Sequence, residues 1–248
     1  VAHGRCAPAV GHGRLRMLAG GVAELARVAA LRIVAAADEG AAGLRPQRLL
    51  RDPRGRDPLR RLRKATPSLS GFVLLLAVRG RTPGLLHHNV WFPQDYDAEF
   101  DAIFGRTPRP VEDPTIYVCA PDDALMRPDD HHESWFVLVN APRHDPVGGV
   151  DWSDAELVRS YSERILSVLA TRGFDVRPRL LWSETRTPAD LERATRSPGG
   201  SIYGTSSNGA RAAFLRPANA SPVPGLFLVG GSAHPGGGLP LVGMSAEI

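Results

Sequence analysis

The residues with the clearest chemical potential lie at the C-terminal end, where glycines separate two apolar segments. Residues 224–248 read Pro-Gly-Leu-Phe-Leu-Val-Gly-Gly-Ser-Ala-His-Pro-Gly-Gly-Gly-Leu-Pro-Leu-Val-Gly-Met-Ser-Ala-Glu-Ile. The apolar run at 226–229 predicts a buried strand, and the apolar residues at 239–246, with Pro240 in the first turn, predict a buried helix. Such a strand–loop–helix unit points backbone N–H groups and the positive end of the helix dipole at an anion or an electron-rich ring. The alternative is that the glycines only let the strand and helix pack closely.

Other signatures of catalysis are missing from the sequence. There is no Gly-x-Ser-x-Gly motif, and no cysteine and histidine stand at the spacing of metal ligands. The adjacent pairs His87-His88 and His131-His132 are not expected to chelate, because neighbouring residues on a strand face opposite ways. The acidic residues before the second pair are expected in a solvated loop. We therefore predict no metal site and nominate no catalytic acid or base.

A dinucleotide-binding fingerprint is also missing. Gly11, Gly13, Gly20 and Gly21 lack the Gly-x-Gly-x-x-Gly spacing and have no strand before them. That fingerprint holds a pyrophosphate at a helix N-terminus, so no such site is predicted in the first part of the chain.

Length and composition indicate an ordinary globular protein. The chain has 248 residues, of which 43% are hydrophobic and 23% charged, enough for one large domain or two small ones. No apolar run is long enough to span a membrane, and the N-terminus has no signal-peptide pattern. Cys6 and Cys119 show no CxxC spacing, which predicts neither a disulfide scaffold nor a zinc site and indicates a reducing, cytoplasmic location.

The elements that must position these residues follow from hydrophobic periodicity. We predict a helix from Gly20 and a strand at 31–37 before the central part of the chain. In the central part we predict strands at 68–79, 115–120 and 135–140 and helices at 95–104 and 154–172. Strands and helices without regular βαβ alternation predict an α/β protein with an α+β sheet layer.

Residues 45–64 form an arginine-rich run. The net charge of the chain is +4, and this run contributes much of the basic charge. Such a run could attract nucleic acid or anionic lipid, or could be a solvated helix surface. Because no aromatic residue interleaves the charges, no base-stacking platform exists and we predict no nucleic-acid partner. Weak peripheral contact with a membrane surface is the better prediction.

Five stretches of the chain resemble one known family. The closing segment LFLVGGSAHPGGGLPLVGMSAEI resembles the closing segment of the bacterial-type phytoene desaturases, the FAD-dependent carotenoid desaturases. The stretches LLHHNVWFPQDYDAEFDAIF, DPTIYVCAPDD, ESWFVLVNAPRH and TPADLERATRSPGGSIYG resemble further motifs of that family. The resemblance runs in order through residues 66–248, in fragments through 20–65, and not at all through 1–19.

The resemblance implies a cofactor, FAD, and places it along the C-terminal segment. It implies that the strand end lies near the ribityl chain and the helix start near the isoalloxazine ring. The cofactor-binding residues that it implies are Gly230, Gly231, Ser232, His234, Gly237, Gly238, Leu239 and Pro240. His234 either touches the flavin or braces the loop. The substrate-facing candidates are His87, Asn140 and Tyr203.

The resemblance also implies the domain organisation and the reaction. Residues 1–66 would be a remnant of an FAD-binding domain with a basic linker, 67–218 a mixed-sheet substrate domain, and 219–248 a truncated FAD-binding segment. The implied activity is hydride transfer from a lipophilic polyene precursor to flavin, which forms conjugated double bonds. Because the family carries the missing fingerprint at its N-terminus, the alternative is an inactive remnant that folds only its substrate domain.

Overall fold

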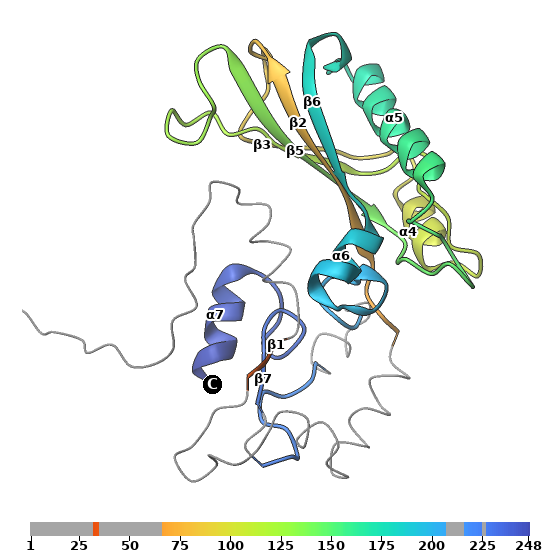
Figure 1. Cartoon of the computed structure of the whole chain (residues 1–248), viewed down its shortest axis with the longest axis vertical. Helices are drawn as coiled ribbons and strands as arrows, with labels where there is room; N and C mark the ends of the chain where they lie inside the picture. The colour runs from red at the N-terminus through yellow and green to blue at the C-terminus, as the bar shows by residue number, and fades with distance from the viewer. Residues whose placement is uncertain (1–31, 35–65, 207–215, 225–226) are drawn as a thin grey trace, which may run out of the picture.

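The computed structural model describes residues 32–34, 66–206, 216–224 and 227–248 (Figure 1). The largest unit is a five-stranded sheet with a long helix on one face. A smaller C-terminal unit follows, in which a two-stranded ladder lies beside the last helix. The predicted helix after Gly20 and the arginine-rich run at 45–64 lie outside the described residues.

The five-stranded sheet is antiparallel throughout, with the strand order β3-β4-β5-β2-β6. Its strands are β2 (Ser70–Arg79), β3 (His88–Trp91), β4 (Ile116–Cys119), β5 (His132–Ala141) and β6 (Leu180–Arg186). The expectation of a mixed sheet is therefore wrong. β5 and β6 run in the same direction, but β2 lies between them and pairs with both, so the two strands never form a parallel ladder.

The two predicted helices of the central part are confirmed to within a residue at each end. They are α4 (Tyr96–Phe104) and α5 (Ala155–Thr171). Each begins after an aspartate, Asp95 or Asp154, whose carboxylate accepts hydrogen bonds from two backbone N–H groups of the first turn. A third helix, α6 (Pro188–Thr195), was not predicted; Thr187 and Asp190 form a reciprocal capping box at its start.

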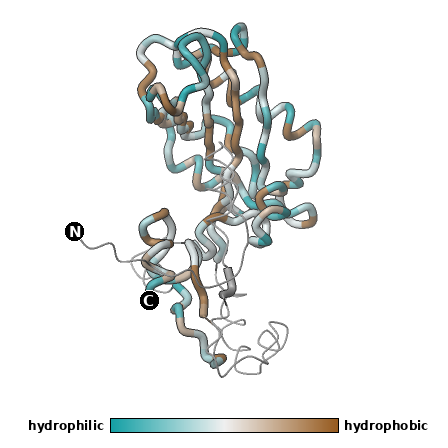
Figure 2. The backbone as a smooth tube through the Cα atoms, turned by 60° about the vertical axis from the view of Figure 1, so that its left-hand side comes forward, coloured by the Kyte–Doolittle hydropathy of each residue, from teal (hydrophilic) through white to brown (hydrophobic). Residues whose placement is uncertain are grey.

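The main core lies between α5 and the face of the sheet that it covers. Phe72, the third residue of β2, is fully buried and meets two aromatic rings from the α5 side. Its ring centroid lies 5.0 Å from that of Tyr161 and 5.3 Å from that of Trp152. The Trp152 indole N–H donates to the carbonyl of Pro142 at 2.8 Å, so the buried ring leaves no polar group unsatisfied. Hydrophobic residues follow the central strands of the sheet in the trace of Figure 2.

The opposite face of the sheet is only half-covered, and we call it the open face. On β5, burial alternates strictly, so Phe136 and Leu138 face the open side while their neighbours face the core. Cross-strand register extends this face to β2, where Leu75 lies opposite Phe136. Val90 and Trp182 add exposed apolar surface at its two edges, with exposed fractions of 49% and 52%. The centre of the open face is thus apolar and partly accessible, and Glu184 of β6, directly opposite Leu75, borders it.

The C-terminal strand and helix form as predicted but are not buried. They are β7 (Phe227–Val229) and α7 (Leu239–Glu247). Phe227 is 40% exposed, and Ser245 is the only buried residue of α7. The predicted strand at 31–37 is represented by β1 (Arg32–Val34), which pairs with β7 in antiparallel fashion. Within the described residues, no helix is both long and apolar enough to cross a membrane.

Candidate functional site

The C-terminal segment folds as a strand, a glycine loop and a helix. Gly230 ends β7 with φ of 124°, and Gly238 precedes α7 with φ of 101°, both in the region that L side chains rarely adopt. Between them the loop turns the chain back, so that α7 contacts β7. The backbone conformation at both glycines explains why the sequence places glycine there.

The buried side chain of Asn219 forms hydrogen bonds to the strand, the loop and the helix of this segment. Its Nδ2 atom lies 2.9–3.1 Å from the carbonyl oxygens of Leu228, His234 and Ser245 and from the Ser245 hydroxyl. The Ser245 hydroxyl in turn accepts the backbone N–H of Gly230 at 3.1 Å. One amide therefore connects the strand, the loop and the helix, although its two hydrogens must be shared among the four acceptors.

We expect Asn219→Ala to loosen the C-terminal segment while the sheet stays folded. The substitution leaves buried carbonyl groups without a donor, which costs about 1–3 kcal/mol. Hydrogen–deuterium exchange should show faster exchange across 227–248 and unchanged protection in β2 and β5. Ser221→Ala is the control, because the Ser221 hydroxyl bonds only within its own turn to Val223. Equal protection in the two variants would contradict this role of Asn219.

The glycine loop contacts the segment that follows α6. The ring of Tyr203 lies against Gly237 so closely that a Cβ on Gly237 would be 2.0 Å from the Tyr203 Cδ1 atom. Arg216 donates to the carbonyls of both Tyr203 and Gly231, at 2.9 and 3.0 Å. A Cβ on Gly204 would likewise come within 2.8 Å of the Ser232 Cβ. These contacts fix where the loop sits.

The N-terminus of α7 is open. Gly238 is its N-cap; among the described residues, no side chain caps it, and a Cβ on Gly238 would meet no atom within 4 Å. Leu239 and Leu241, in the first turn of α7, are 60% and 37% exposed. The helix start thus offers free backbone N–H groups beside uncovered apolar side chains.

The structure does not bring the three substrate-facing candidates together. His87 precedes β3, beside the end of β4, whereas Asn140 lies beyond the opposite end of β4 in the register. Asn140 donates its amide to the Glu99 carboxylate at 2.7 Å. The ring of Tyr203 lies against Gly237 of the glycine loop. Their proposed contact with substrate stays a prediction.

Glu99 is a buried polar residue that sequence reasoning missed. It is 1% exposed, and its carboxylate accepts from the backbone N–H of Thr115 and from Asn140, both at 2.7 Å. The pKa of nearby Tyr161 is raised, by burial first and by the Glu99 charge as a smaller cause. The sequence did contain a signal for a buried carboxylate here, because this glutamate stands within the apolar pattern of a predicted helix.

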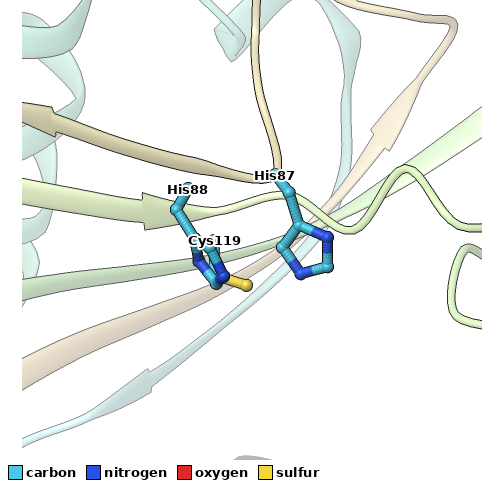
Figure 3. A group of neighbouring side chains, drawn as sticks. All are labelled: His87, His88 and Cys119. Carbon is cyan, nitrogen blue, oxygen red and sulfur yellow. The ribbon is translucent and has the colours of Figure 1, made fainter.

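We expected His87 and His88 not to chelate a metal because neighbouring residues on a strand face opposite ways. That geometric argument is wrong for this pair. His87 lies in the bend before β3, so strand alternation does not apply to it. One potential ligand atom from each of His87, His88 and Cys119 lies within 4.8 Å of the others (Figure 3). Beside them, burial and then a hydrogen bond with the Cys119 thiol raise the pKa of Tyr117 to about 12.

Comparison with known proteins matches this chain to proteins named as carotenoid desaturases and oxygenases, although no family model matches the chain. The hydroxyneurosporene desaturase of Rubrivivax gelatinosus is 36% identical over 207 residues, 77% of this chain and 37% of the relative. The zeta-carotene-forming phytoene desaturase of Myxococcus xanthus is 37% identical over 80% of this chain and 38% of the relative. The 4,4'-diapolycopene oxygenase of Methylomonas sp. is 34% identical over 82% and 40%.

The chain belongs to the carotenoid desaturase family. The resemblance seen in its motifs is thereby confirmed. The matched stretches make up less than half of the length of these relatives, from 37% to 40%. The domain boundaries at 66/67 and 218/219 and the cofactor-binding residues stay predictions.

Proposed function

We propose that this chain is part of an FAD-dependent oxidoreductase that introduces conjugated double bonds into a carotenoid or a related polyene precursor. The observation that carries the proposal is the open N-terminus of α7 at the end of a glycine loop, in a chain that belongs to the carotenoid desaturase family. Two of the matching relatives are named as desaturases, which supports the proposed desaturation.

The residues around α7 fit the ring end of a flavin. Gly238 leaves open space where a Cβ would otherwise stand, and the uncapped N–H groups beyond it can donate to an electron-rich ring. Leu239 and Pro240 would contact the flat face of the ring, with Gly237 and His234 on the preceding loop. Gly230, Gly231 and Ser232 would lie toward the ribityl chain. FAD bound here would supply the hydride acceptor.

The protein would then orient the polyene and exclude water from the reacting carbons. A hydride, carrying both electrons of its C–H bond, would leave one carbon of the substrate for the bound flavin, and a proton would leave the neighbouring carbon for solvent, so that a new double bond forms between the two carbons. The open face of the sheet supports this role, because Leu75, Phe136 and Leu138 offer a continuous apolar wall for a hydrocarbon chain. No residue is proposed as the acid or base.

Visible absorbance tests the proposal directly. The purified chain is measured before and after incubation with FAD and removal of free cofactor. We expect retained flavin bands, shifted from those of free FAD by the apolar surroundings. Assays with polyene precursors in lipid vesicles would then show absorption at longer wavelength as conjugation extends. A colourless chain after incubation would contradict the proposal for this chain and favour the inactive remnant.

A further inference from the structure

The fold brings two histidines and a cysteine together at one end of the β3–β4 ladder. His88 and Cys119 are direct partners in the antiparallel register, so their side chains lie on the same face of the sheet. His87 is held next to them because its carbonyl accepts the backbone N–H of Ala120 at 2.9 Å. The two imidazole centroids are 4.4 Å apart. Figure 3 shows the three side chains converging on the same space.

The spacing of the three ligand atoms matches a single small cation after minor adjustment. All three lie within 4.8 Å of one another. Tetrahedral zinc, with bonds of about 2.0–2.3 Å, holds its ligand atoms roughly 3.3–3.7 Å apart. His87 lies in a bend, half-buried, so a change of side-chain rotamer can close the difference without moving a strand.

The donor set selects the metal. Two imidazoles and a thiolate are borderline to soft ligands, which favour zinc over magnesium or calcium. Three protein ligands with an exposed member leave the fourth position to water, since His88 is exposed. We propose that His87, His88 and Cys119 bind one Zn²⁺ ion at the outer end of the β3–β4 ladder. Binding transfers the thiol proton of Cys119 to solvent and forms the zinc–sulfur bond.

Tyr117 is suited to orient the site without ligating the metal. Its hydroxyl lies 2.9 Å from His88 Nδ1, and its ring stacks on the His88 ring at a centroid distance of 6.0 Å and an interplanar angle of 19°. When Nδ1 donates its hydrogen to this hydroxyl, the lone pair of Nε2 is left for the metal. Tyr117 is therefore a positioning residue.

Bound zinc is expected to stabilise the pairing of β3 with β4 at the edge of the sheet. β3 is a four-residue edge strand that pairs only with β4 within the described sheet. A metal bonded to both His88 and Cys119 would hold this short edge closed and make its pairing dependent on the metal. This inference does not depend on the proposed flavin chemistry.

Metal titration of the whole chain tests the proposal. The reduced, metal-free protein is titrated with Zn²⁺ against a chromophoric chelator, and with Co²⁺ while absorbance is recorded. We expect one Zn²⁺ per chain at micromolar or lower concentration. The Co²⁺ form should show ligand-field bands of tetrahedral intensity and a thiolate-to-metal charge-transfer band.

Variants identify the ligands. Cys119→Ser should abolish the charge-transfer band, and His87→Ala and His88→Ala should each weaken zinc binding at least tenfold. Tyr117→Phe should weaken it about tenfold and keep the charge-transfer band, as expected for a residue that only orients a ligand. Two controls should bind as the parent does. His131→Ala with His132→Ala removes the other histidine pair, and Cys6→Ser removes the other thiol.

Three results would overturn the proposal. They are binding only at millimolar metal, a charge-transfer band that survives Cys119→Ser, and a band that is lost in Cys6→Ser. Far-UV circular dichroism of each variant separates loss of ligands from loss of fold. If Cys119→Ser unfolds the chain, alkylation of the thiol in folded protein, with and without bound zinc, decides the question. Unchanged alkylation in the presence of zinc would contradict ligation by Cys119.

Discussion

Replacing Phe72 by alanine should lower the free energy of unfolding by about 3–5 kcal/mol, the range for removal of a buried aromatic ring. The side chain is 0% exposed and belongs to the main core between the sheet and α5. Its loss removes ring contacts with both Tyr161 and Trp152 and leaves a cavity between β2 and the helix. This is a large part of the total stability of an ordinary domain.

Urea unfolding followed by circular dichroism measures this loss, and Phe92→Ala is the matched control. Phe92 is 65% exposed, and its ring contacts only Tyr96 at a centroid distance of 5.8 Å among the described ring pairs. We expect the control to change stability by about 0.5 kcal/mol or less. Similar midpoints for the two variants would show that the core does not centre on Phe72.

The central elements could be predicted because their signals are local. β2 and β5 are long runs of apolar and β-branched residues, and α4 and α5 begin at aspartate caps that the sequence displays. β6 was missed because most of its residues, including Trp182 and Ser183, are half-buried or exposed, which leaves no hydrophobic alternation to detect. The antiparallel order could not be predicted either, because it depends on which strands pair across long separations.

The sequence predicted which segment forms the candidate site, but not how its side chains are arranged. The apolar runs and the glycines between them indicated a strand, a loop and a helix between 226 and 246. The buried contact between Asn219 and Ser245 joins residues far apart in sequence, and no local pattern marks it. The same holds for His87 and Cys119, which only the register of β3 with β4 brings together. Side-chain convergence of this kind is a property of tertiary structure.

We expect Gly237→Ala to reduce flavin retention by tenfold or more, if FAD binds where we propose. The added Cβ would stand 2.0 and 2.2 Å from two ring carbons of Tyr203. Either the ring or the loop must therefore move, and overpacking of this kind costs about 1–3 kcal/mol. Because Gly238 and the start of α7 follow directly, a displaced loop misplaces the N–H groups that would face the flavin ring.

A rescue variant separates this cause from general damage to the segment. Gly243→Ala adds the same methyl group within α7, where nothing lies within 4 Å, and should retain flavin like the parent chain. Tyr203→Ala combined with Gly237→Ala removes the obstructing ring and should restore most of the flavin, read as bound absorbance per chain after desalting. Undiminished flavin in Gly237→Ala would show that the loop does not position the cofactor. If the double variant still retains little flavin, the glycine is needed for a reason other than its contact with Tyr203.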